Sequence, residues 1–168
     1  MSDRPSSLRL RQGLVLLAGA VIFALVVGSE PGRFFWVPLG IGLVYLAAAI
    51  AGGRRGGYWA TAVVLLGWGA AVLWAREGRP DLDFSGLYLL GAGAGATVGV
   101  VLQRRGFAVD ALGLTATVAL AGLVLALAPQ WPEVIEEART YALLVGLVGL
   151  VNVVLGALGR RSADLPTA

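Results

Sequence analysis

The chain has 168 residues, of which 58% are hydrophobic and only 14% are charged. Soluble domains carry about 25% charged residues, so this composition excludes an ordinary water-soluble globule and favours a membrane protein. The sequence contains no cysteine and no histidine, which excludes disulfides, thiolate chemistry and imidazole bases or metal ligands.

The chain begins with a polar stretch, residues 1–12, which is followed by a first apolar run at 13–28. A basic tail before an apolar run is also typical of a secretory signal peptide. No A-x-A cleavage site follows the run. We therefore expect an uncleaved membrane helix preceded by a cytoplasmic tail.

Five further apolar runs follow, separated by short polar turns. Each run suits a hydrocarbon core about 30 Å thick, because an α-helix rises 1.5 Å per residue. The expected helices are 13–28, 34–53, 58–75, 84–102, 107–128 and 140–159, with a second tail at 160–168. The sequence thus predicts an all-α, polytopic membrane protein whose six helices form three helical hairpins.

The arginines predict the orientation of these helices. All basic residues are arginines, and nine of the 13 fall in the two tails and in the turns that follow even-numbered helices. They include the pairs Arg54 and Arg55, Arg104 and Arg105, and Arg160 and Arg161. Arginine accumulates in the short loops on the cytoplasmic side of a membrane. Both ends of the chain are therefore expected in the cytoplasm, with the helices in a bacterial inner membrane. The basic balance is therefore a topology signal, and no nucleic-acid partner is expected.

Two stretches of the chain align without gaps at an offset of 50 residues, 34–56 and 84–106. Each begins with Phe and closes with Arg-Arg-Gly, which indicates an internal repeat of one hairpin. Together with Trp36-Val-Pro-Leu-Gly-Ile-Gly42, Arg54-Arg55, and Tyr58-Trp59 through Gly67-Trp-Gly69, this pattern resembles the HdeD family of bacterial acid-resistance membrane proteins. That resemblance implies a role in acid stress and no enzymatic activity.

The run 87–102 carries glycine at 91, 95 and 99, one helical turn apart. In lipid this spacing, of the glycine-zipper type, favours a groove on which another helix backbone can pack closely. The segment Gly91-Ala-Gly93-Ala-Gly-Ala96, with Asp110 further on, also fits a dinucleotide-binding fingerprint. That reading requires a strand–turn–helix unit, whereas the flanks here are long apolar runs, so we expect a helix-packing interface and no bound cofactor.

A few polar residues fall within or beside the predicted spans, namely Asp110, Thr115, Thr117 and Asn152. An acid in a membrane segment is a functional candidate by default, but Asp110 lies in the first turn of its helix, where a structural interfacial role is expected. Asn152 is expected to bond across helices, and the threonines can return their hydroxyls to their own backbone. Tyr45 and Trp68 are expected to be packing residues.

No set of residues suggests a catalytic or metal site. The expected function is therefore a non-enzymatic membrane protein that acts through helix packing, as an accessory or scaffold subunit or as a homo-oligomer, with the fourth helix as its contact face. Its partners would be membrane lipid and another membrane protein or a second copy. The main alternative is a channel or transporter for a small solute, with a path lined by Asp110, Thr115, Thr117 and Asn152. An enzyme acting on lipids is a more distant alternative.

Overall fold

A computed structural model describes residues 4–27, 35–78, 84–111, 114, 115, 118, 130 and 138–163. Five long α-helices account for most of them: α1 (Arg4–Val27), α2 (Val37–Gly52), α3 (Trp59–Gly78), α4 (Phe84–Arg104) and α7 (Ala138–Ala163). A short 3-10 helix, η2 (Gly53–Arg55), continues α2. The protein is therefore all-helical in its described part, and these five helices match five of the six expected ones.

The helices extend beyond the apolar runs from which they were predicted. α1 begins at Arg4, within the stretch expected to be a tail, and α3 and α7 continue to Gly78 and Ala163. An apolar run marks the part of a helix that suits hydrocarbon, but the backbone ladder of an α-helix can continue into polar residues on either side. The predicted limits are therefore those of the apolar runs and not those of the helices.

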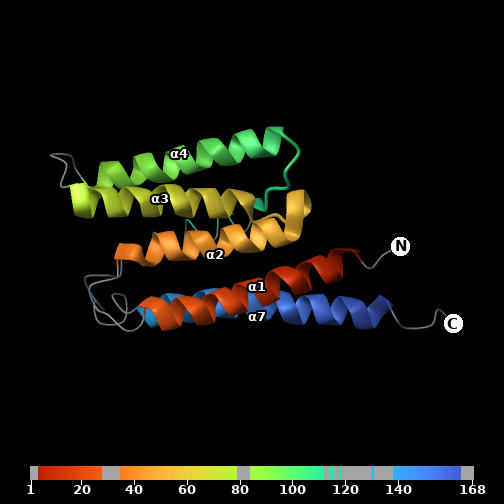
Figure 1. Cartoon of the computed structure of the whole chain (residues 1–168). Helices are drawn as coiled ribbons and strands as arrows, with labels where there is room; N and C mark the ends of the chain where they lie inside the picture. The colour runs from red at the N-terminus through yellow and green to blue at the C-terminus, as the bar shows by residue number, and fades with distance from the viewer. Residues whose placement is uncertain are drawn as a thin grey trace.

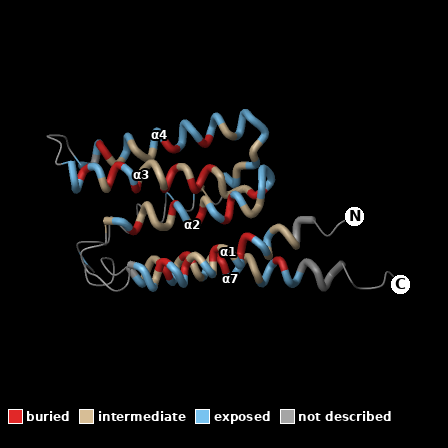
Figure 2. Tube along the Cα trace, in the orientation of Figure 1, coloured by how far each residue is buried: buried red, intermediate tan, exposed pale blue. Residues whose placement is uncertain are grey.

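All five helices are long and apolar enough to cross a membrane, with candidate spans at Ser7–Val26, Val37–Arg55, Trp59–Gly78, Gly86–Arg104 and Arg139–Leu158. Exposed positions recur along every helix (Figure 2). Many of them carry large apolar side chains, among them Leu89 and Leu143, each 75% exposed. Such surfaces are expected where the surrounding solvent is hydrocarbon. The sixth expected helix, 107–128, lies mostly outside the described residues.

The helices lie in the spatial order α7, α1, α2, α3, α4 (Figure 1). Neighbours run antiparallel, so the start of α1, η2, the end of α4 and the end of α7 all lie at one end of the bundle. We call this the arginine end, because the backbone of all three Arg-Arg pairs lies there.

Small residues allow the helices to approach closely. A Cβ atom added at Gly13 of α1 would lie 2.7 Å from the backbone nitrogen of Val153 in α7, and one at Gly149 would lie 2.9 Å from that of Leu17. A central cluster then joins four helices through Leu16, Ala20, Tyr45, Ala48, Ala62, Leu65 and Val145. Because lipid is as apolar as these side chains, close van der Waals contact holds the bundle together rather than hydrophobic burial.

Candidate functional site

The three glycines predicted to form a packing interface face α3. A Cβ atom at Gly91 would lie 2.5 Å from the carbonyl oxygen of Gly67, and one at Gly95 would lie 2.7 Å from the Cα atom of Val64. Gly99 faces Ala60, at 3.5 Å from its Cβ atom. The three glycines therefore pack against α3, the preceding helix of the same chain.

The opposite face of α4 is open. A Cβ atom at Gly93 would meet nothing within 4 Å, and the neighbouring side chains Leu89, Leu90 and Val98 are exposed. Gly91 and Gly93 lie inside a continuous helix and not in a loop after a strand. The geometry that a dinucleotide fingerprint requires is thus missing from this segment.

Two of the four polar residues of the expected solute path donate hydrogen bonds to the backbone of their own segment. The Thr115 hydroxyl donates to the carbonyl of Ala111 at 2.9 Å, and the Asn152 amide donates to the carbonyl of Val148 at 2.8 Å. The Thr97 hydroxyl similarly donates to the carbonyl of Gly93 at 2.9 Å. Thr117 lies outside the described residues.

Two of the predicted residues nevertheless act on the same side chain, Tyr58, at the arginine end. The side chains of Tyr58 and Asn152 are hydrogen bonded, and the charges of Asp110 and Arg9 both act on the Tyr58 phenol. Tyr58 also packs edge-on against Tyr45, with 5.5 Å between the ring centroids. The chain thus brings polar groups from α1, α7 and two turns to one place.

Partial burial raises the pKa of Tyr58 above its ordinary value of 10.0, and the nearby Asp110 carboxylate raises it further. The hydrogen bond with Asn152 and the positive charge of Arg9 act in the opposite direction. Burial dominates because a phenolate is poorly solvated away from water. Tyr58 is therefore a neutral hydrogen-bonding group at physiological pH.

Gln12 of α1 is a functional candidate that the sequence analysis missed. Its side chain is only 3% exposed, and its amide nitrogen donates to the carbonyls of Ala48 at 3.2 Å and Gly56 at 2.6 Å. A Cβ atom at Gly56 would lie 2.7 Å from that nitrogen, so a side chain there would displace the Gln12 amide. The sequence feature that could have identified Gln12 is the position of this uncharged amide, between the arginines and the first apolar run.

The turns after α2 and α4, which the repeat alignment superimposes, pack against each other. Tyr58 and Val109 form an isolated antiparallel bridge, and the Ala108 nitrogen donates to the carbonyl of Arg54 at 2.7 Å. The Arg54 guanidinium lies 5.2 Å above the centre of the Phe107 ring. Asp110 is held here by its backbone, because its nitrogen donates to the carbonyl of Gly57 at 3.0 Å while its own carbonyl accepts from Leu114. Asp110 thus begins the helical turn that follows.

One buried polar atom has no partner within the part of the chain that the structure describes. The side chain of Thr61, in the first turn of α3, is 1% exposed, and its hydroxyl makes no hydrogen bond. The Ala62 nitrogen donates to the carbonyl of Tyr58, so the helical turn that contains Thr61 starts at Tyr58. Polar groups therefore continue from the arginine end into the bundle for one turn.

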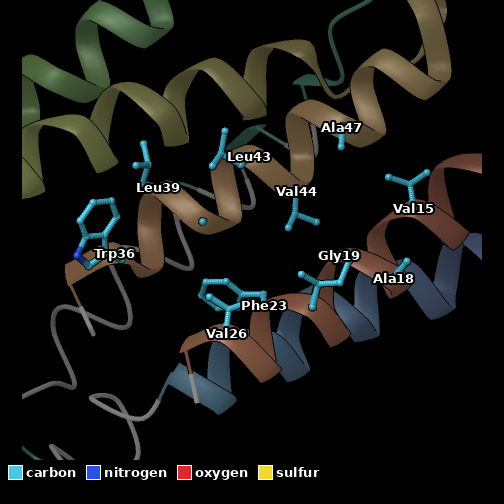
Figure 3. Close-up of a pocket in the computed structure, with 12 residues that line it drawn as sticks. Val15, Ala18, Gly19, Phe23, Val26, Trp36, Leu39, Leu43, Val44 and Ala47 are labelled. Carbon is cyan, nitrogen blue, oxygen red and sulfur yellow. The ribbon is translucent and has the colours of Figure 1, made fainter. Parts of the chain in front are cut away.

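A second candidate site is an apolar groove of about 820 Å³ between α1 and α2. Val26 and Trp36 lie at one end of it, and Val15 and Ala47 lie at the other (Figure 3). The lining residues are Val15, Ala18, Gly19, Ile22, Phe23, Val26, Trp36, Leu39, Gly40, Leu43, Val44 and Ala47. The Trp36 indole nitrogen is the only polar side-chain atom among these residues.

Among the described residues, no three acidic side chains gather where they could hold a metal ion. No family model, curated protein or solved structure matches the chain.

Proposed function

We propose that the protein is a non-enzymatic, multi-pass membrane protein that acts through helix packing, as an accessory or scaffold subunit or as a homo-oligomer. One observation carries this proposal: of the described helices, α4 packs extensively only on α3. Its remaining faces are exposed, and they include Gly93, whose surroundings are empty. A helix of another molecule can approach closely where a glycine faces lipid.

The contact face that we propose on α4 contains Gly93 and Thr97, with exposed leucine and valine side chains on either side. The Thr97 hydroxyl is already bonded to the carbonyl of Gly93, so this face presents no unsatisfied polar atom to lipid. It lies opposite the Gly91, Gly95 and Gly99 stripe, so a partner could bind without displacing α3.

Cysteine cross-linking tests this face, because the chain has no cysteine of its own. A single Gly93→Cys variant is oxidised in native membranes and compared with Leu143→Cys, which places the thiol on an exposed position of α7. We expect a cross-linked product, either a dimer or an adduct with another protein, at position 93 and not at 143. Equal products at both positions, or none at 93, would contradict the proposal.

A solute path remains the second candidate, because Asn152 is hydrogen bonded to Tyr58, the charge of Asp110 acts on the same phenol, and the unpartnered Thr61 hydroxyl follows one turn away. These residues would form the entrance of a path at the arginine end. Proton flux into vesicles that contain a pH-sensitive dye tests this candidate. A path predicts flux above that of protein-free vesicles, reduced by Asn152→Ala and unchanged by Thr97→Ala; flux equal to the background would remove the candidate.

We further propose a bacterial inner-membrane location with both chain ends in the cytoplasm, supported by the arginines of the η2 turn and of the turn after α4, which lie at one end of the bundle. Reporter fusions at the two ends test this topology, and opposite compartments would contradict it. The resemblance to the HdeD family adds a role in acid stress. Survival of a deletion strain at low pH, with and without the gene restored, tests that role.

A further inference from the structure

We propose that the groove between α1 and α2 binds one acyl chain of a phospholipid, with the phosphate of that lipid at the end marked by Trp36 and Arg76. This proposal does not depend on whether α4 binds a partner. It concerns a different surface, and it assigns to that surface a ligand of stated chemistry.

The groove has the length of one bilayer leaflet. From Val15 to Val26 along α1, and from Trp36 to Ala47 along α2, the helices rise about 17 Å at 1.5 Å per residue. Half of a typical hydrocarbon core is about 15 Å. A membrane-spanning helix of another protein would need a groove through both leaflets, whereas the acyl chain of one lipid needs only this length.

The groove begins at one membrane boundary and ends near the middle of the spans. Trp36 directly precedes the α2 span, which begins at Val37, and Val26 ends the α1 span. Val15 lies close to the middle of that α1 span, Ser7–Val26. A lipid whose headgroup lies at the Trp36 end would therefore place its acyl chain along the whole groove.

The Trp36 end carries the groups that recognise a lipid headgroup. The Trp36 side chain is 47% exposed, and an indole at the interface can donate its N–H to a phosphate or ester oxygen. The Arg76 guanidinium lies 4.7 Å from the centre of the Phe35 ring, beside Trp36 in the chain. A guanidinium in this position complements the charge of a phosphate.

The floor of the groove is a closed contact between the two helices. A Cβ atom at Gly40 would lie 2.5 Å from the Phe23 ring, and Gly19 is in equally close contact with the Val44 side chain. The helices therefore touch beneath the groove, while small residues such as Ala18 and Ala47 leave it open toward lipid (Figure 3). Both alanines are exposed, so larger side chains there can fill the groove without entering the core.

Native mass spectrometry of the full chain tests the proposal. The protein is reconstituted into vesicles of phosphatidylethanolamine and phosphatidylglycerol, extracted with mild detergent, and the retained phospholipids are counted. We expect one retained phospholipid on the unaltered chain and its loss in the double variant Ala18→Phe, Ala47→Phe. The matched control is Ala94→Phe, Ala96→Phe, which adds the same two rings at exposed positions of α4 and should retain the lipid.

The headgroup end has its own test. Arg76→Gln should lower the retention of phosphatidylglycerol about fivefold, the effect of removing one interfacial cation. Arg104→Gln removes an exposed arginine at the opposite end of the bundle and should leave that retention unchanged. Equal losses in the two variants would mean that net charge, and not this end of the groove, selects the lipid.

A photo-crosslinking residue in place of Leu43 detects a bound phospholipid without filling the groove. Leu43 is exposed and lines the groove, while Leu90 on α4 is an exposed control. Phospholipid adducts enriched at 43 over 90 would support the proposal. Adducts of 43 with a second copy or another protein, or retention of the lipid by the folded Ala18→Phe, Ala47→Phe variant, would overturn it.

Discussion

The α3–α4 and α1–α2 interfaces are both built on glycine, but only the first is closed. In α3–α4 the glycines meet backbone: Gly91 faces the carbonyl of Gly67, and Gly95 faces Val63 and Val64. In α1–α2 each glycine meets a large side chain, because Gly19 receives Val44 and Gly40 receives Phe23. The glycine spacing therefore shows that helices approach each other, whereas the residue opposite each glycine decides whether space remains beside the contact.

The largest expected effect breaks the closed interface. Gly95→Leu would force a side chain into the backbone of Val63 and Val64, which cannot move aside as a side chain can. We expect a loss of about 3 kcal/mol or more in the free energy of unfolding, at the upper end of overpacking costs. Unfolding in mixed micelles measures this loss. Gly93→Leu on the open face of α4 is the matched control, and an equal loss there would contradict the comparison.

A smaller loss of stability is expected at the α1–α2 interface, where Gln12 joins the two helices by hydrogen bonds at the arginine end. Gln12→Ala removes both hydrogen bonds to the carbonyls of Ala48 and Gly56. We expect a loss of about 1–2 kcal/mol, near the upper range of side-chain hydrogen bonds within membranes. The same unfolding measurement applies. Thr97→Ala removes a hydrogen bond within one helix and should change stability much less; a comparable loss there would argue against a tie between α1 and α2.

Alkaline pH should weaken the arginine end, where both interfaces terminate. Because the folded chain holds the pKa of Tyr58 above 10.0, folding favours the neutral phenol. This contribution is fully present below pH 10 and is lost as the pH rises through the higher pKa of the folded state. The stability of the unaltered chain should therefore fall above pH 10, and less so in Tyr58→Phe. An identical alkaline decline in both proteins would exclude Tyr58 as the group responsible.

The smallest expected effect is on the stability of the groove-filling variant. The phenylalanines of Ala18→Phe, Ala47→Phe would face lipid, so the free energy of unfolding should change by about 0.5 kcal/mol or less, as for other surface substitutions. Thermal unfolding in detergent measures it. A large destabilisation would show that the groove closes in solution, and that the two interfaces differ less than their glycine contacts indicate.

The places of five helices follow from the sequence, although their ends do not, because hydropathy is a local property. An apolar run in lipid must satisfy its backbone internally, and a helix does this whatever lies beside it. The arginine turns and the glycine stripe on α4 could be predicted for the same reason. Each of them depends on residues close together in the chain.

Only the tertiary structure decided what each helix face meets. The stripe of Gly91, Gly95 and Gly99 was assigned to another molecule, yet α3 occupies it, because spacing does not identify the partner of a groove. Gln12 was placed in a tail, although the carbonyls that bury it come from Ala48 and Gly56, far along the chain. The meeting of Asp110 and Asn152 at Tyr58 likewise depends on how α7 packs beside α1. In lipid every helix has apolar faces, so hydropathy by itself does not determine which faces pair.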